Sequence, residues 1–217
     1  MREYLDIERW ARRDLFEFFR SYDDPYFNIC TRLDVTRLLL ILRDHPEIAV
    51  SLAYYYFALR VANEVEPFRY RLQDDKIVIY SVINGGTTVL LPNETFTYAY
   101  FDYHENLETF VREAGRSVRQ VQNGSGELKP SMRDDLIYFT TLPWVSFTSF
   151  AHAHKKGRGD SVPRIAFGKF VKVKEQTLLP ISVEVHHALM DGLHVGRYLS
   201  RLEEALTEPE VFLYPGR

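Results

Sequence analysis

The chain has 217 residues, of which 46% are hydrophobic and 26% charged, a globular composition that excludes disordered and collagen-like classes. Its 27 Lys and Arg against 30 Asp and Glu give a formal net charge of −3, so it lacks the basic field of a general nucleic-acid binder. The single cysteine, Cys30, cannot form an internal disulfide, which is typical of a reducing compartment. We therefore expect one domain over residues 1–217 without a nucleic-acid partner.

The sequence shows neither a signal peptide nor an apolar segment long enough to cross a membrane. Residues 1–10 are charged from the second position and lack the apolar core of a signal peptide. The longest uncharged apolar stretch, residues 48–59, is shorter than the about 20 residues that cross a bilayer. The sequence thus predicts a soluble cytoplasmic protein with no membrane partner.

Apolar residues recur at helical spacing in the first third of the chain. Residues 11–22 predict an amphipathic helix, and Asp34 is the predicted N-cap of a helix that carries the leucines of residues 38–42. Residues 48–63 are apolar on most sides, so we expect a deeply buried helix there.

A strand-rich segment follows. Residues 76–82 are rich in β-branched side chains, and Asn-Gly-Gly at 84–86 is typical of a turn. We therefore predict a hairpin in which residues 87–91 pair with residues 76–82. Residues 96–101 predict a further aromatic strand.

The second half of the chain shows both helical and strand periodicity. Residues 107–121 carry a clear helical stripe that ends in a loop at 123–126, and an amphipathic helix closes the chain over residues 195–206. Residues 154–160 predict a polar loop. The strands predicted here are residues 136–141, 145–150, 164–174 and 178–185. The sum is an α/β chain with one mixed sheet covered by helices.

Two consecutive histidines end the last of these strands. His186 and His187 are followed, four residues later, by Asp191 and Gly192, just before a helix. A neutral imidazole at the end of a strand can take a proton from a hydroxyl or a thiol near pH 7. Asp191 in that position could order the loop through an ion pair. The alternative is that both histidines are ordinary residues with satisfied hydrogen bonds.

The wider pattern around this motif resembles the chloramphenicol acetyltransferase family. His-His-Ala-Leu-Met-Asp-Gly at residues 186–192 is followed by a further histidine and an arginine. The same His-His-x-x-x-Asp-Gly core occurs in other CoA-dependent acyltransferases. The other segments that match the family, in its order, are residues 10–17, 33–36, 94–96, 143–150 and 168–170.

The resemblance implies a fold and an activity. It implies a two-layer sandwich with a mostly antiparallel mixed sheet covered by helices, and a homotrimer with active sites between subunits. The implied reaction moves an acetyl group from acetyl-CoA, a co-substrate, to a hydroxyl of chloramphenicol or a related small alcohol, a route to antibiotic resistance. No metal and no bound cofactor are implied.

The resemblance also assigns residues to this chemistry. His187 would be the general base, and Asp191 would pair with Arg12 to hold the site in shape. Thr140 stands where the family has a serine that donates to the oxyanion. Trp144 and Lys169 would bind the coenzyme.

The acceptor pocket departs from the family's pattern. The implied lining residues include His152 and five aromatic residues, each of which could equally be simple core: Phe19, Phe27, Phe96, Tyr138 and Phe150. His152 and His154 replace apolar residues of the family's pocket wall, and the charged residues that follow them are Lys155, Lys156 and Arg158. Ala166 and Phe170 replace a threonine and a tyrosine. An acceptor more polar or more anionic than chloramphenicol would suit these changes.

Two further functions remain open on the sequence. A catalytically drifted trimer that binds CoA or another ligand would explain Thr140, Ala166 and Phe170. A metalloprotein would use His152, His154, His187 and His194 as ligands.

Overall fold

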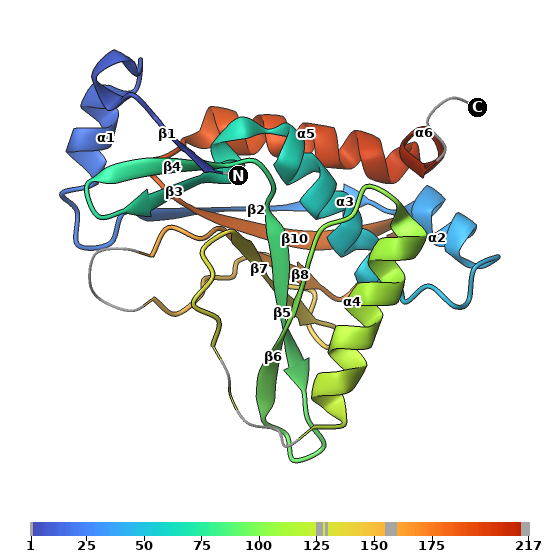
Figure 1. The fold of residues 1–217 in the computed structure, drawn as a ribbon. Helices are drawn as coiled ribbons and strands as arrows, with labels where there is room; N and C mark the ends of the chain where they lie inside the picture. The colour runs from blue at the N-terminus through green and yellow to red at the C-terminus, as the bar shows by residue number, and fades with distance from the viewer. Residues whose placement is uncertain (1, 125–127, 129, 155–159, 214–217) are drawn as a thin grey trace.

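The computed structural model describes residues 2–124, 128, 130–154 and 160–213, which form two β-sheets and a set of helices (Figure 1). The larger sheet has seven strands. Their order is β2 (Tyr26–Asp34), β10 (Gln176–His186), β8 (Arg164–Gly168), β7 (Leu136–Leu142), β5 (Asn84–Leu90) and β6 (Phe96–Phe101), with β9 (Val171–Val173) paired to β10. Only the β5–β7 and β7–β8 pairs are parallel, so the predicted mixed, mostly antiparallel sheet is confirmed.

A second, three-stranded sheet lies beside the first. It consists of β1 (Arg2–Tyr4), β4 (Lys76–Tyr80) and β3 (Tyr70–Gln73), all antiparallel, and two short 3-10 helices, Ile7–Arg9 and Glu66–Arg69, lie next to its strands in the chain. The expectation of a single sheet is therefore wrong. The predicted hairpin is wrong as well, because β4 pairs with β1 and β3 rather than with β5.

The glycines that resembled a turn lie inside β5, where they make room for aromatic rings. A Cβ on Gly85 would overlap the ring of Phe101, its partner on β6. A Cβ on Gly86 would lie 2.8 Å from the ring of Tyr100. Glycine in a strand interior often marks such a close approach. Composition alone does not separate this use of glycine from a turn.

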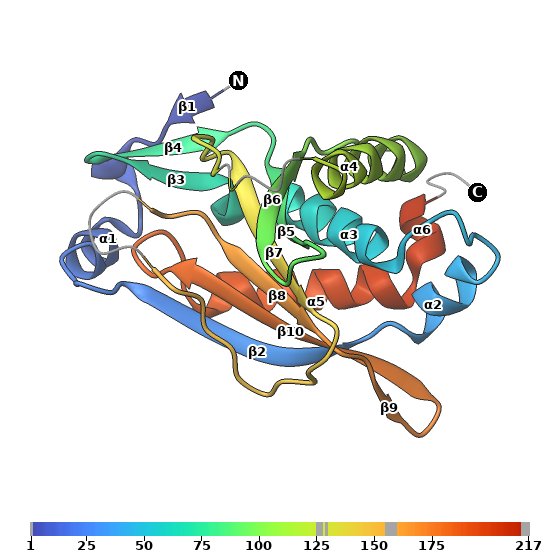
Figure 2. The same ribbon diagram turned by 90° about the horizontal axis from the view of Figure 1, so that it is seen from below.

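The helices lie mainly on one face of the larger sheet (Figures 1 and 2). The six α-helices of the described residues are α1 (Arg13–Phe19), α2 (Thr36–Leu42), α3 (Val50–Glu64), α4 (Leu107–Gln122), α5 (Gly192–Thr207) and α6 (Pro209–Leu213). The segment after β7, yellow to orange in the figures, crosses the opposite face of the sheet, which the helices leave uncovered.

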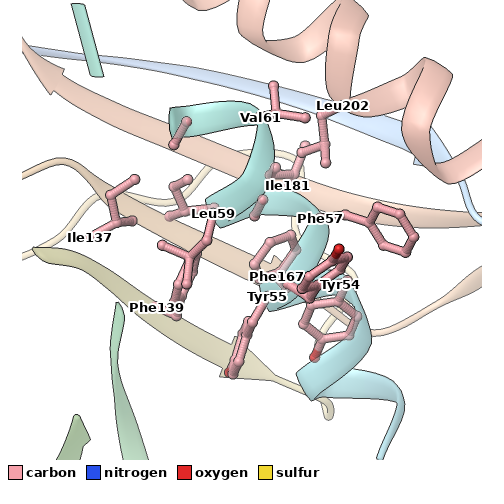
Figure 3. Close-up of a cluster of buried hydrophobic side chains, with 14 of the residues drawn as sticks. Tyr54, Tyr55, Phe57, Leu59, Val61, Ile137, Phe139, Phe167, Ile181 and Leu202 are labelled. Atoms are coloured by element: carbon pink, nitrogen blue, oxygen red, sulfur yellow. The ribbon is translucent and has the colours of Figure 1, made fainter. Parts of the chain in front are cut away.

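The core lies between α3 and the sheet (Figure 3). Residues 52–59 of α3 are all buried, as its all-round apolar sequence predicts. Phe139 of β7 stacks against Tyr55, and Phe167 of β8 tilts against Tyr54. Helix α5 packs against both α3 and β2. The hydroxyls of Tyr54 and Tyr55 both bond Thr141, so the polar ends of these rings are satisfied inside the core.

Several predicted boundaries shift. The first helix covers only Arg13–Phe19, and residues 145–150 form no strand but an irregular segment after a turn at Pro143. The strand predicted over 164–174 divides into β8 and β9. The N-cap of α2 is Val35; Asp34, one residue earlier, still accepts from the Thr36 amide at 2.9 Å.

A fully buried arginine joins the two sheets. Arg71 of β3 donates to the carbonyls of Phe68, Tyr70, Asp134 and Leu136, at 2.6 to 2.9 Å. Burial disfavours its charge and lowers the pKa of Arg71 to about 10, so the guanidinium stays protonated near neutral pH.

Arg71→Met is expected to destabilise the protein by about 3 kcal/mol or more, because it leaves buried carbonyls unpaired. For a chain of this size that corresponds to a fall in Tm of about 6–12 °C. Thermal unfolding followed by circular dichroism measures it. Arg71→Lys, which keeps the charge and some donors, should recover part of the loss. A fall of less than about 2 °C for Arg71→Met would contradict this account.

Candidate functional site

The loop between β10 and α5 brings together the chain's two most distant motifs. Asp191 is the N-cap of α5, and its side chain accepts from the Leu193 amide at 3.1 Å. The same carboxylate forms an ion pair with Arg12, 179 residues earlier. Arg12 also donates to the backbone carbonyl of His187 at 3.2 Å. The ion pair therefore fixes the backbone on which His187 stands.

His194 completes the cap. The Asp191 amide donates to Nδ1 of His194 at 3.1 Å, so that nitrogen is an acceptor, and burial lowers the pKa of His194. Burial acts on Asp191 in the opposite direction and would raise its pKa, but the charge of Arg12 and the hydrogen bonds from Leu193 and Arg12 outweigh it. The pKa of Asp191 is therefore lowered from its usual 3.8.

The lowered pKa of Asp191 makes this ion pair sensitive to acid. Its stabilisation is fully present above the unfolded value of 3.8 and is lost as the pH falls through the lower folded value. Asp191→Asn should lower Tm by about 2–8 °C near neutral pH, which corresponds to about 1–2 kcal/mol. Thermal unfolding measured from pH 7 to pH 3 should show this difference shrinking only below about pH 4. An unchanged difference at pH 3 would contradict the assignment.

His187 itself is held by its backbone and by aromatic rings. Its amide donates to the Pro25 carbonyl at 2.7 Å. Its ring lies parallel to Phe19, with centroids 3.8 Å apart, and 4.6 Å from the ring of Phe27. Within the described part of the chain, Nδ1 of His187 is buried and makes no hydrogen bond. The half-buried imidazole is thus positioned by packing.

The neighbouring histidine has a different environment. His186 is buried, accepts from the Ala188 amide at 3.3 Å and lies edge-on to Tyr26, with centroids 5.2 Å apart. Burial lowers the pKa of His186 to about 4, so its ring is neutral near pH 7. Its contacts are those of a structural residue.

Thr140 lies on the sheet face that the helices leave uncovered. Its neighbours Phe139 and Thr141 point to the helix layer, where Thr141 bonds Tyr54 and Tyr55, so Thr140 points away from it. Thr140 pairs with Ala166 of β8, and Ala166 pairs with Ser182 of β10. Among the described residues the Thr140 hydroxyl makes no hydrogen bond, so it is available to a ligand.

His187 and Thr140 do not meet within one chain. Thr140 lies two strands away from Ser182 in register, and His187 follows Ser182 by five residues along β10. With strands about 4.8 Å apart and about 3.3 Å per residue, the two lie roughly 15–20 Å apart.

Trp144 and Lys169 come together at the far end of β7 and β8. The Lys169 amide donates to the Val145 carbonyl at 2.9 Å. A Cβ on Gly168 would lie 2.9 Å from the same carbonyl, so glycine permits this close approach. Both side chains are exposed, and Trp144 keeps 63% of its surface accessible.

The expected acceptor residues fall into separate groups. Phe19 and Phe27 contact His187. Phe150 lies edge-on to His152, with centroids 4.8 Å apart, and Tyr138 is half-buried on β7. Phe96 lies on β6, the edge strand farthest from β2, and is half exposed.

The structure shows a polar cluster that the sequence motifs did not identify. Glu184 of β10 is buried and faces His152, His154 and Arg164. The alternation of β10 is the signal that could have found it, because this pattern puts Ser182, Glu184 and His186 on one face. Residues 155–159, with the predicted basic side chains Lys155, Lys156 and Arg158, lie outside the described residues.

The described residues show neither a metal site nor a membrane-spanning helix. In the described ranges, no group of three or more His, Cys, Asp or Glu side chains is arranged to hold a metal ion. His194 caps a helix and His152 and His154 face Glu184, so the four histidines of the metalloprotein hypothesis do not gather. Over the same ranges, no helix has the length and apolarity needed to cross a membrane.

Comparison with known proteins agrees with this architecture. A sequence profile of the chloramphenicol acetyltransferase family matches residues 2–203. A chloramphenicol acetyltransferase of Proteus mirabilis is 27% identical over 205 residues, 94% of each chain, and chloramphenicol acetyltransferase 3 of Escherichia coli is 29% identical over 203 residues, 92% of this chain and 94% of that one.

Solved structures extend the comparison. A chloramphenicol acetyltransferase structure superposes with a TM-score of 0.85 at 26% identity, covering 95% of this chain and 100% of that one. A dihydrolipoamide acetyltransferase of Azotobacter vinelandii, 13% identical, shares the fold with a TM-score of 0.69 over 92% of this chain and 88% of that one. The chain belongs to the chloramphenicol acetyltransferase family of acyltransferases.

Proposed function

We propose that this protein transfers an acetyl group from acetyl-CoA to a hydroxyl of chloramphenicol or a related small alcohol, with His187 as the general base. The observation that carries the proposal is the setting of His187. Its imidazole is half-buried between Phe19 and Phe27, and its backbone is tied to Pro25 and Arg12. Such a fixed ring can remove a proton from a bound alcohol.

The reaction then needs no covalent enzyme intermediate. His187 takes the proton of the acceptor hydroxyl as its oxygen attacks the thioester carbonyl. Thr140 donates a hydrogen bond to the resulting tetrahedral oxyanion. The oxyanion collapses, the carbon–sulfur bond breaks, and the imidazolium returns the proton to the departing CoA sulfur. Asp191 and Arg12 hold the loop that carries the base.

We propose that the complete site forms between subunits of a homotrimer. The separation of roughly 15–20 Å between His187 and Thr140 is too large for both to act on one carbonyl within one chain. A second copy could bring its Thr140 to this His187. The whole chain, residues 1–217, would then act as one catalytic domain of a cytoplasmic enzyme, and acetylation of chloramphenicol would give resistance.

The coenzyme would lie at the opposite end of the same face. Trp144 offers an exposed aromatic surface, and Lys169 offers a positive charge for phosphate groups. Their backbones are held together by the bond between Lys169 and Val145. We therefore propose acetyl-CoA as co-substrate, with no metal in the reaction.

A free-thiol assay tests this function. Purified protein is incubated with acetyl-CoA and chloramphenicol, and then with a panel of small alcohols. Release of thiol that depends on the acceptor supports the proposal. Binding of CoA without thiol release for any acceptor would overturn it and favour a drifted ligand-binding protein instead.

A further inference from the structure

The uncovered face of the sheet carries a row of polar side chains between the regions of His187 and Thr140. In register across four strands, Asn28 of β2 lies opposite Glu184 of β10, Glu184 opposite Arg164 of β8, and Arg164 opposite Tyr138 of β7. The adjacent row contains Thr140 itself. Because paired residues share a face, all of these side chains belong to the face on which Thr140 lies.

Glu184 is the centre of this row. Its side chain is only 3% exposed, yet three nitrogen atoms surround its Oε1. Nε2 of His154 lies at 2.9 Å, Nδ1 of His152 at 3.3 Å and Nη1 of Arg164 at 3.7 Å. Its Oε2 accepts from the His152 amide at 3.1 Å. Glu184 therefore binds the irregular segment after β7 to the sheet through both the backbone and the side chains of that segment.

The cluster continues towards the histidine pair. Nη1 of Arg164 donates to Nδ1 of His154 at 2.6 Å, and this leaves the proton of that ring on Nε2, facing Glu184. Tyr26 stacks on His154 with centroids 3.9 Å apart and lies edge-on to His186. Arg164 also pairs with Asp160.

The ring nitrogens of His152 are buried and lack a well-aligned hydrogen bond within the described residues, although Nδ1 lies 3.3 Å from Oε1 of Glu184. Burial alone would raise the pKa of Glu184, but its contacts with His152 and His154 outweigh that and lower it, so the carboxylate is ionised. Unpaired buried polar groups are costly, and each one calls for a reason.

From this arrangement we infer that Glu184 is a specificity-determining residue, which positions His152 and His154 as a polar wall for a neutral, polyhydroxylated acceptor such as a sugar. This inference rests on the proposed function and names its acceptor class. A hydroxyl group can both donate and accept a hydrogen bond. Such a group matches the mixture of donors and acceptors on the half-buried side chains around the cluster, which are Tyr26, Asn28, Tyr138 and His154. A charged acceptor of either sign would meet a like charge, because Arg164 and two carboxylates already share the cluster.

Steady-state kinetics with three acceptors tests the inference. The probes are a methyl hexopyranoside, chloramphenicol and benzyl alcohol, each with acetyl-CoA in the free-thiol assay. We expect kcat/KM for the hexopyranoside to exceed that for benzyl alcohol by about tenfold or more. Glu184→Gln should raise KM for the hexopyranoside by about tenfold with little change in kcat or in KM for acetyl-CoA, because the wall acts in binding.

A second variant guards against a folding defect. His152→Leu leaves the backbone bond to Glu184 in place and removes only the side-chain contact at 3.3 Å, so Tm should fall by no more than about 4 °C while the preference shifts towards benzyl alcohol. His45→Leu, at an exposed histidine between α2 and α3, is the matched control and should change no kinetic constant.

The outcomes separate the two claims. Turnover of benzyl alcohol and chloramphenicol at rates equal to or above that of the hexopyranoside, unchanged in both cluster variants, would overturn this inference and leave the proposed acetyl transfer standing. Thiol release with none of the three acceptors would overturn the proposed function and this inference with it.

Discussion

Replacing His187 by alanine is expected to lower kcat for acetyl transfer by about 10³–10⁴-fold, because the acceptor hydroxyl loses the group that removes its proton. The ring's neighbours are apolar, so alanine at this position leaves no buried charge unpaired. The fold should therefore survive. The measurement is acceptor-dependent thiol release, with circular dichroism to confirm that the variant is folded.

A second variant distinguishes the loss of the imidazole from a small change in its position. Phe19→Leu removes the ring stacked on His187 at 3.8 Å but leaves the imidazole in place, so we expect a loss of about tenfold rather than a thousandfold. Retention of more than a tenth of the wild-type rate by His187→Ala would contradict the assignment of the base.

Strong local periodicity predicted the elements that need little help from distant residues. Residues 48–63 and 107–121 are helical almost as predicted, because a sustained apolar stripe fits only one geometry. The alternation of residues 181–185 likewise placed its apolar members in the core. By contrast, the first three residues of β5 were wrongly predicted as a turn and its pairing as a hairpin with residues 76–82. Its glycines make room for rings of β6, a contact between strands that local sequence does not display.

The candidate site likewise contains one part that the sequence predicted and one part that it did not. The motif resemblance joined Arg12 to Asp191 across 179 residues, and the structure shows that ion pair. It did not indicate the cluster around Glu184, whose members come from β8, β10 and the segment after β7. These residues belong to no shared motif, and only the strand register makes them neighbours. Predicting such a cluster requires the sheet order.

The second large effect concerns the oxyanion. Thr140→Val removes the hydroxyl and keeps the shape, so it should lower kcat by about 10²–10³-fold, or about 3–4 kcal/mol of transition-state stabilisation. The hydroxyl makes no hydrogen bond among the described residues, so valine should not lower Tm.

The manner of the loss is as informative as its size. An interaction made only in the transition state lowers kcat and kcat/KM equally, whereas a ground-state contact raises KM. Thr140→Ser keeps a donor and loses a methyl that restricts χ1, so it should retain most of the rate. If Thr140→Val and Thr140→Ser lose activity to the same extent, the position matters through packing against its β8 partner Ala166, and the oxyanion assignment is wrong.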